Sequence, residues 1–74
     1  MSIQDQVYNY ILKYYPRGSD MFTITRKIIG STYYYEEQVD SAIRRLIRIN
    51  KLRFNANTML VYPTAPSQSF LDLA

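Results

Sequence analysis

The stretch from Thr32 to Asn50, TYYYEEQVDSAIRRLIRIN, constrains the fold of this chain more than any other. Its apolar residues recur at steps of three and four, which is the repeat of one face of an α-helix. Acidic residues precede basic ones along the stretch, and this order complements the helix dipole at both ends. The sequence therefore predicts an amphipathic helix around residues 33–49. Its buried stripe comprises Val39, Ala42, Ile43, Leu46, Ile47 and Ile49.

The opposite face of this helix is polar and its second half is basic. Glu37, Ser41, Arg44 and Arg48 project away from the stripe, with Gln38 and Arg45 on one shoulder and Asp40 on the other. Residues 44–53 contain five cations and no acid. A local basic field of this kind attracts nucleic acid or an acidic protein surface. The alternative is a solvated helix face with no partner. The five cations are Arg44, Arg45, Arg48, Lys51 and Arg53.

Composition limits the chain to one small domain with little scope for catalysis. The 74 residues include no cysteine and no histidine, so a disulfide framework and the commonest metal ligand and general base are absent. Glu36 and Asp40 are four residues apart, but two carboxylates without a third ligand are typical of solvated surface. We expect no enzyme activity, metal or cofactor. No long apolar run or leader segment is present, which favours a soluble, cytoplasmic protein without a membrane partner.

Two further helices are expected before the long one. Ser2 and Asp5 have the spacing of a capping box, and the first helix should run from about residue 3 to 15, where Pro16 ends it. Thr23 should cap a short helix over residues 24–29, and Gly30 should stop it. Ser31 or Thr32 should then cap the long helix. The expected buried stripe of the first helix is Ile3, Val7, Tyr8, Ile11, Tyr14 and Tyr15.

Asn50 should end the long helix in a left-handed conformation, and after it the pattern changes to strands. Residues 51–54 and 59–62 are β-prone and flank turn chemistry at 55–58, which predicts a hairpin. From residue 63 the chain is rich in proline and serine, so we expect a domain over 1–62 and a flexible or docking tail over 63–74. That tail could dock on the domain, pair with a second copy or bind a partner protein. The hairpin residues expected to pack on the helices are Leu52, Phe54, Leu60 and Tyr62.

This order of elements resembles the winged helix-turn-helix family of DNA-binding domains over residues 3–62. FTITRKIIG at 22–30 is similar to the family's second helix, and QVDSAIRRL at 38–46 is similar to its recognition helix. INKL at 49–52 resembles the exit into the wing. The chain departs from the family in a long, tyrosine-rich turn before the recognition helix. It also departs in a short wing, with only Arg53 as a charged residue in its strands. The resemblance implies a mainly α fold, with three helices plus a small β-hairpin as the wing.

The resemblance implies binding of duplex DNA by a transcriptional regulator. The recognition helix would enter the major groove, with Gln38 and Ser41 reading base edges and Arg44 serving either bases or phosphates. Cations of the helix end, wing and second helix would hold phosphates, and the hydroxyls before the helix would donate to them. The candidate DNA-binding residues are Arg26, Lys27, Thr32, Tyr33, Tyr34, Gln38, Ser41, Arg44, Arg45, Arg48, Lys51 and Arg53.

One feature opposes DNA binding and favours a second hypothesis. Glu36, Glu37 and Asp40 crowd the helix end that should meet the groove, unless they serve the helix dipole or accept from cytosine amino groups. The alternative is a protein-interaction module, an inhibitor or adaptor of a larger machine, that uses the tyrosines and the C-terminal tail. A homodimer fits either hypothesis, because dimers read two half-sites.

Overall fold

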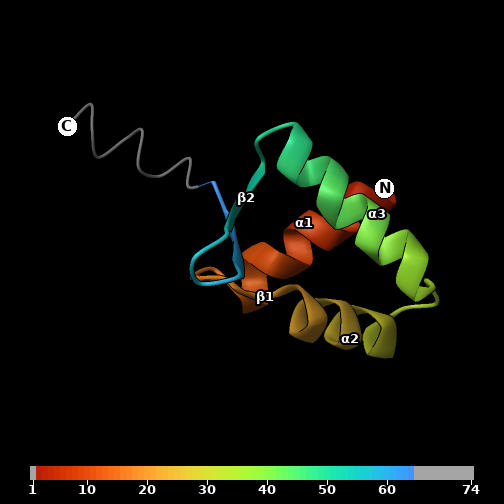
Figure 1. The fold of residues 1–74 in the computed structure, drawn as a ribbon. Helices are drawn as coiled ribbons and strands as arrows, with labels where there is room; N and C mark the ends of the chain where they lie inside the picture. The colour runs from red at the N-terminus through yellow and green to blue at the C-terminus, as the bar shows by residue number, and fades with distance from the viewer. Residues whose placement is uncertain (1, 65–74) are drawn as a thin grey trace.

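The computed structural model describes residues 2–64 and shows a mainly helical protein with a small antiparallel sheet (Figure 1). α3 packs against both other helices and against β2, so it lies at the centre of the fold. The predicted three helices and hairpin are confirmed, whereas the tail over residues 65–74 lies outside the described residues. In chain order the elements are α1 (Ile3–Tyr14), β1 (Ser19–Asp20), α2 (Met21–Ser31), α3 (Glu36–Arg48), β2 (Leu52–Asn55) and β3 (Leu60–Pro63).

α1 begins where its capping residue predicted. The Ser2 Oγ accepts a hydrogen bond from the Asp5 N–H at 3.2 Å, and the helix ends at Tyr14, one residue before the predicted end. Tyr14 is 55% exposed, so its predicted place in the buried stripe is wrong. Its ring lies against that of Tyr10, with the centroids 4.6 Å apart, and Tyr10 is the ring that packs on the core.

α2 is longer than predicted and is capped by a different residue. The Asp20 carboxylate accepts from the Thr23 N–H at 2.9 Å and from the Thr23 hydroxyl at 2.7 Å. Thr23 is therefore not the N-cap, because Asp20 supplies a charged acceptor three residues earlier. The predicted stop at Gly30 is also wrong, since the helix continues to Ser31 with Gly30 inside it.

The hydroxyl residues at the C-terminal end of α2 form hydrogen bonds to that helix. The hydroxyls of Ser31 and Thr32 donate to carbonyls in the last turn of α2, at 3.0 and 2.8 Å. The prediction that one of them caps α3 is therefore wrong. α3 begins only after Tyr35, whose N–H donates to Oε1 of Gln38 at 2.8 Å. This glutamine satisfies one backbone donor at the start of the helix.

The end of α3 confirms the predicted left-handed stop. Asn50 has a φ of 66°, and its N–H donates to the Ile47 carbonyl at 3.1 Å. The Lys51 N–H donates to the Leu46 carbonyl at 2.9 Å, which completes a Schellman motif. Ile49 is 51% exposed, contrary to its predicted place in the stripe, because the helical repeat has already ended at that residue.

The sheet contains one strand that the sequence pattern did not predict. β3 lies between β1 and β2 and is antiparallel to both, with Val61 opposite Ser19 on one side and Phe54 on the other. The turn before β1 needs Gly18, whose φ is +91° and whose missing Cβ would lie 2.7 Å from the Val61 carbonyl oxygen. A side chain at residue 18 would therefore push β1 away from β3.

The inward face of the hairpin differs from the predicted one. Leu52 and Val61 are buried, whereas Leu60 and Tyr62 are only partly buried and Phe54 is 43% exposed. The prediction counted Met59 as part of the second strand, but that residue lies in the turn with a φ of 61°. Successive side chains of a strand alternate between faces, so Val61 rather than its neighbours faces the helices. Pro63, also buried, extends β3 one residue beyond the predicted domain end.

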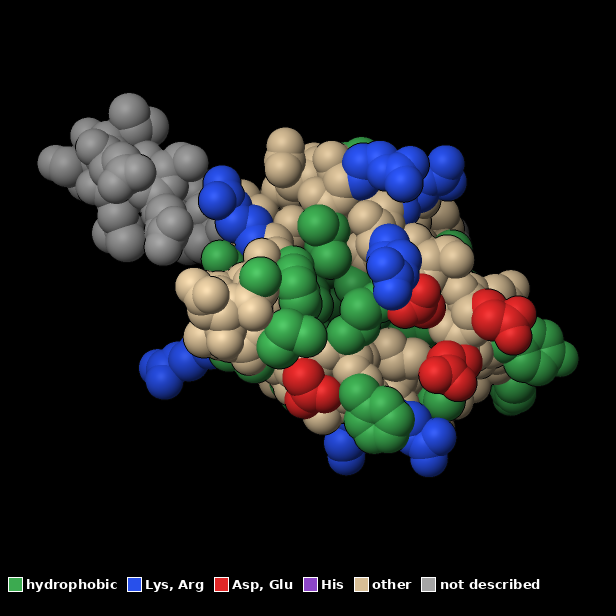
Figure 2. Space-filling view, viewed as in Figure 1, with side chains coloured by type: hydrophobic (Ala, Val, Ile, Leu, Met, Phe, Trp, Pro, Cys, Tyr) green, Lys and Arg blue, Asp and Glu red, His purple; other side chains and the backbone are tan. Residues whose placement is uncertain are grey.

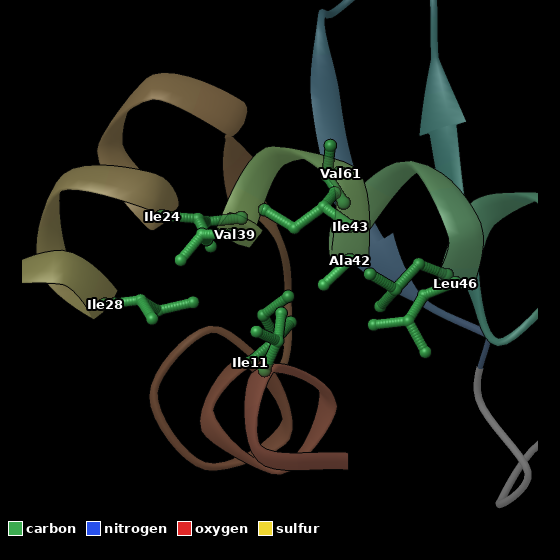
Figure 3. Packing of buried hydrophobic residues seen from close by; sticks show 10 residues of the cluster. Ile11, Ile24, Ile28, Val39, Ala42, Ile43, Leu46 and Val61 are labelled. Carbon is green, nitrogen blue, oxygen red and sulfur yellow. The ribbon is translucent and has the colours of Figure 1, made fainter. Parts of the chain in front are cut away.

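One apolar core joins all three helices to the sheet. Figure 3 shows Ile24 and Ile28 of α2 and Ile11 of α1 pointing toward the buried side of α3. None of the helices in residues 2–64 is long and apolar enough to span a lipid bilayer. The core consists of Val7, Ile11, Ile24, Ile28, Val39, Ala42, Ile43, Leu46, Leu52 and Val61.

Candidate nucleic-acid interface

The exposed face of α3 carries charges of opposite sign at its two ends. Figure 2 shows Lys and Arg side chains gathered over the C-terminal half of the helix, and Asp and Glu side chains over its N-terminal half. Arg44, Arg45 and Arg48 are all exposed, as are Glu36 and Glu37. Each group opposes the partial charge of the nearer helix end. A polyanion is therefore attracted to the C-terminal half of α3 and repelled from its first turn.

Arg44 is already engaged with an acid of the same helix. Its Nε lies 2.8 Å from Oδ2 of Asp40, which is the one ion pair among residues 2–64. The Arg44 and Asp40 side chains are 69% and 40% exposed. An exposed pair four residues apart contributes only about 0.3–0.5 kcal/mol, so a phosphate can compete for this guanidinium.

Arg45 and Arg48 are the cations of α3 that remain unpaired within the described chain. Neither makes a hydrogen bond or ion pair in residues 2–64. Both line a shallow depression between α3 and the start of α1, together with Gln38 and Ser41. We call this surface the basic depression; its lining is Ile3, Gln4, Glu37, Gln38, Ser41, Ala42, Arg44, Arg45 and Arg48.

Gln38 and Ser41, predicted to read bases, both line this depression, but they differ in whether the side chain already forms a hydrogen bond. The Gln38 Oε1 accepts the Tyr35 N–H, so the side-chain amide NH₂ is the group left to donate outward. Ser41 is exposed and forms no hydrogen bond to residues 2–64 through its hydroxyl. The depression therefore offers donors from Gln38 and Ser41 beside two free guanidinium groups.

The two cations beyond α3 lie apart from this depression. The Lys51 Nζ lies 5.2 Å from the centre of the Tyr8 ring, a cation–π distance. Arg53 is exposed on β2, which is one of the two edge strands of the sheet. The structure thus brings Arg44, Arg45 and Arg48 together on one helix and places the other two members of the sequence block on neighbouring elements.

Of the two candidate DNA-binding residues of α2, Arg26 lies near acidic side chains and Lys27 is exposed to solvent. Arg26 lies 5.8 Å from the centre of the Phe22 ring and lines a groove between α2 and α3 together with Glu36, Glu37 and Asp40. Lys27 is exposed on the next position of the helix. Three carboxylates in one groove offset the attraction of Arg26 for a phosphate.

The hydroxyl residues before α3 divide into two kinds. Thr32 has its hydroxyl committed to the Ile28 carbonyl at 2.8 Å and also accepts the Tyr34 N–H at 3.3 Å. Tyr34 is partly buried against the core. Tyr33 is fully exposed and Tyr35 is 75% exposed, so both rings can contact a partner.

The structure also contains an apolar surface that the sequence did not predict. Phe22 of α2, Phe54 of β2 and Met59 of the hairpin turn are 70%, 43% and 60% exposed. They surround a hollow of about 600 Å³ between α2, α3 and the sheet. Figure 2 shows apolar side chains forming its floor beside α3. We call it the apolar hollow; its lining is Asp20, Met21, Phe22, Arg44, Ile47, Phe54 and Met59.

The Asp20 carboxylate at the edge of this hollow is held in its charged form. The hydrogen bond from the Thr23 hydroxyl, followed by that from the Thr23 N–H, lowers the Asp20 pKa below its ordinary value.

Within residues 2–64, acidic side chains do not gather in groups of three that could hold a metal ion.

Comparison with known proteins leaves the family open. No protein-family model matches this chain, and neither the curated proteins nor the solved structures contain a significant match. The winged-helix resemblance therefore stays a prediction, carried by the order of the elements and the side chains described above.

Proposed function

We propose that this protein binds duplex DNA through α3, as a small winged helix-turn-helix regulator of transcription. The order of the elements supports this proposal, since three helices are followed by a hairpin and a third strand joins the sheet before α2. In such domains the last helix enters the major groove and the hairpin lies against the neighbouring backbone. α3 has an exposed polar face, as that role requires.

The observation that carries the proposal is the basic depression. Arg45 and Arg48 project from α3 without an intramolecular partner among residues 2–64, and the Gln38 amide and Ser41 hydroxyl lie in the same surface. Guanidinium groups hold phosphates, and amide and hydroxyl groups donate to base edges. In this proposal Arg45 and Arg48 bind phosphates and Gln38 and Ser41 face the bases.

The acidic first turn determines how the duplex would approach. Glu36 and Glu37 are exposed at the N-terminal end of α3, where they repel phosphates. The phosphate contacts are therefore assigned to the C-terminal half of α3 and to Lys51 and Arg53 beyond it. Arg44 joins them when a phosphate replaces Asp40 as its partner, at a cost of a few tenths of a kcal/mol.

Salt-dependent binding tests the proposal. The affinity for a random-sequence duplex should fall as salt rises, with a slope of about −0.9 on logarithmic axes for each phosphate contacted. Replacing Arg45 and Arg48 by alanine should reduce that slope by about 2 and weaken binding at every sequence tested.

The matched control removes two cations from another surface. Lys13→Ala/Arg17→Ala makes the same change in net charge, at the end of α1 and in the turn that follows it. This variant should keep nearly all of the affinity and the slope. Equal losses in both double variants would show a nonspecific charge effect, and wild-type protein that shows no salt-dependent binding would refute the proposal.

A second function is favoured by the exposed tyrosines. Tyr33 and Tyr35 present two rings to solvent beside the acidic start of α3, and Tyr35 has no role in the proposed contact with DNA. Tyrosine is enriched at the centres of protein interfaces. A protein-interaction module that binds a basic partner surface through this end of α3 is the alternative. Replacing Tyr35, which is not a candidate DNA-binding residue, by serine should weaken such binding strongly while leaving affinity for DNA within about twofold.

A further inference from the structure

The apolar hollow is open to solvent, and apart from Arg44, which lines both surfaces, its residues play no part in the proposed contact with DNA. Its three most exposed apolar side chains, Phe22, Met59 and Phe54, come from α2, the hairpin turn and β2. Together they expose on the order of 300 Å² of apolar surface, judged from the sizes of such side chains. A contiguous patch of this size equals the largest patch on many monomeric proteins and commonly marks an interface.

The hollow carries opposite charges at two places on its lining. Asp20 lies at the start of α2, and Arg44 projects from the middle of α3. Apolar side chains, including Ile47 and Met21, occupy the lining with them. A surface that holds an acid, an apolar floor and a base is complementary to a copy of itself, because a two-fold rotation brings the acid of one copy toward the base of the other.

We propose that a second copy of this chain occupies the apolar hollow and forms a two-fold symmetric dimer. In that contact Phe22 and Met59 of each copy enter the hollow of the other, and Asp20 of each copy approaches Arg44 of its partner. The same patch is used on both sides, as expected for a closed dimer rather than an open chain of molecules.

The area predicts a weak dimer. A stable interface buries about 800 Å² on each partner, and the three exposed apolar side chains supply less than half of that. The remainder must come from the polar rim, so association in the micromolar range is expected. Arg45 and Arg48 line the basic depression and not the hollow, so the dimer leaves them accessible.

The mass in solution tests this proposal without DNA. Sedimentation equilibrium of residues 1–74 should show the one-chain mass of 8.8 kDa at about 5 µM and a shift toward twice that mass at about 500 µM. Since no nucleic acid is present, the result is independent of the proposed function. A one-chain mass across this range would overturn the dimer.

Two substitutions in the hollow distinguish lost contact from lost folding. Met59 has a φ of 61°, a conformation that asparagine adopts more readily, so Met59→Asn removes an apolar side chain without straining the turn. Phe22→Ser removes the most exposed ring of the patch. Each should weaken dimerisation tenfold or more while the circular dichroism spectrum and melting temperature show a folded domain.

A control substitution and a truncation test whether something other than a second copy fills the apolar hollow. Tyr33→Ser removes a still more exposed ring that lies before α3 and outside the lining of the hollow, and it should leave dimerisation unchanged. If Tyr33→Ser weakens the dimer as much as Phe22→Ser does, the contact lies elsewhere and the proposal fails. It also fails if the full chain is monomeric and removal of residues 65–74 releases dimerisation, because the chain's own C-terminal segment would then fill the hollow.

Discussion

α3 borders two apolar surfaces that differ in how they are covered. On one side Val39, Ile43 and Leu46 are buried against α1, α2 and the sheet. On the other side Ile47 lines the apolar hollow, where Phe22 and Met59 remain largely exposed. Burial of the first surface supplies the free energy of folding, because the hydrophobic contribution scales with the area removed from water. The second surface contributes little until another molecule covers it.

The largest expected effect comes from the enclosed surface. Ile43→Ala leaves a cavity among side chains that exclude water and should lower the free energy of unfolding by about 2–5 kcal/mol. A domain of this size has only a few kcal/mol of net stability, so much of the variant should be unfolded at room temperature. Chemical denaturation measures the change.

Ile47→Ala is the matched control for that substitution. It makes the same truncation four residues later, at the border of the open hollow. We expect a loss of about 1 kcal/mol, because Ile47 is only partly buried. Equal losses at Ile43 and Ile47 would show that the two surfaces do not differ as described.

The next effect concerns Asp20, which caps α2 at the edge of the hollow. The pKa of Asp20 is lower in the folded protein than in the unfolded chain. The ionised carboxylate therefore stabilises the fold at any pH above the unfolded-state pKa. This stabilisation is lost as the pH falls through the folded-state pKa. Asp20→Asn should lower the denaturation midpoint near neutral pH, by less than Ile43→Ala. The difference from wild type should shrink below about pH 4. A difference that stays constant from neutral to acidic pH would contradict the assigned cause.

Much of the fold could be predicted because its signals are local. The repeat of three and four in α3 and the turn residues between β2 and β3 depend on neighbours in sequence, and both predictions are confirmed. β1 could not be predicted, because two residues carry no pattern and become a strand only by pairing with β3. Glycine at residues 18 and 30 gave the same turn signal, yet a Cβ added at residue 18 would lie 2.7 Å from the Val61 carbonyl oxygen, whereas one added at residue 30 would meet no atom within 4 Å.

The candidate site was predictable in its charges and not in its shape. The cations of α3 followed from the sequence, and even the Arg44–Asp40 pair has the usual spacing of four residues. The engagement of Gln38 with Tyr35 has the spacing of a capping box, so that signal was present in the sequence. The apolar hollow gave no such signal, because Phe22, Phe54 and Met59 come together only through tertiary packing.

A smaller effect of opposite sign is expected at Gly30, which borders neither apolar surface. It lies within α2, and a Cβ added there would meet no atom within 4 Å. Gly30→Ala should therefore raise the free energy of unfolding by about 0.5–1 kcal/mol, because alanine loses less backbone entropy in a helix. The same change at Gly18 should destabilise the protein instead, since the φ there is +91°. Thermal melts of the two variants check both signs.

The smallest effect on the monomer is expected at Phe22, within the open surface. Phe22→Ser should change the free energy of unfolding by less than about 0.5 kcal/mol in dilute solution, because 70% of the residue is already exposed. At high protein concentration the wild type should melt at a higher temperature, since dimerisation stabilises only the folded state, and the variant should not. Melts at two concentrations therefore separate the two apolar surfaces of α3. A change at Phe22 as large in dilute solution as that at Ile43 would show that the hollow is part of the folded core.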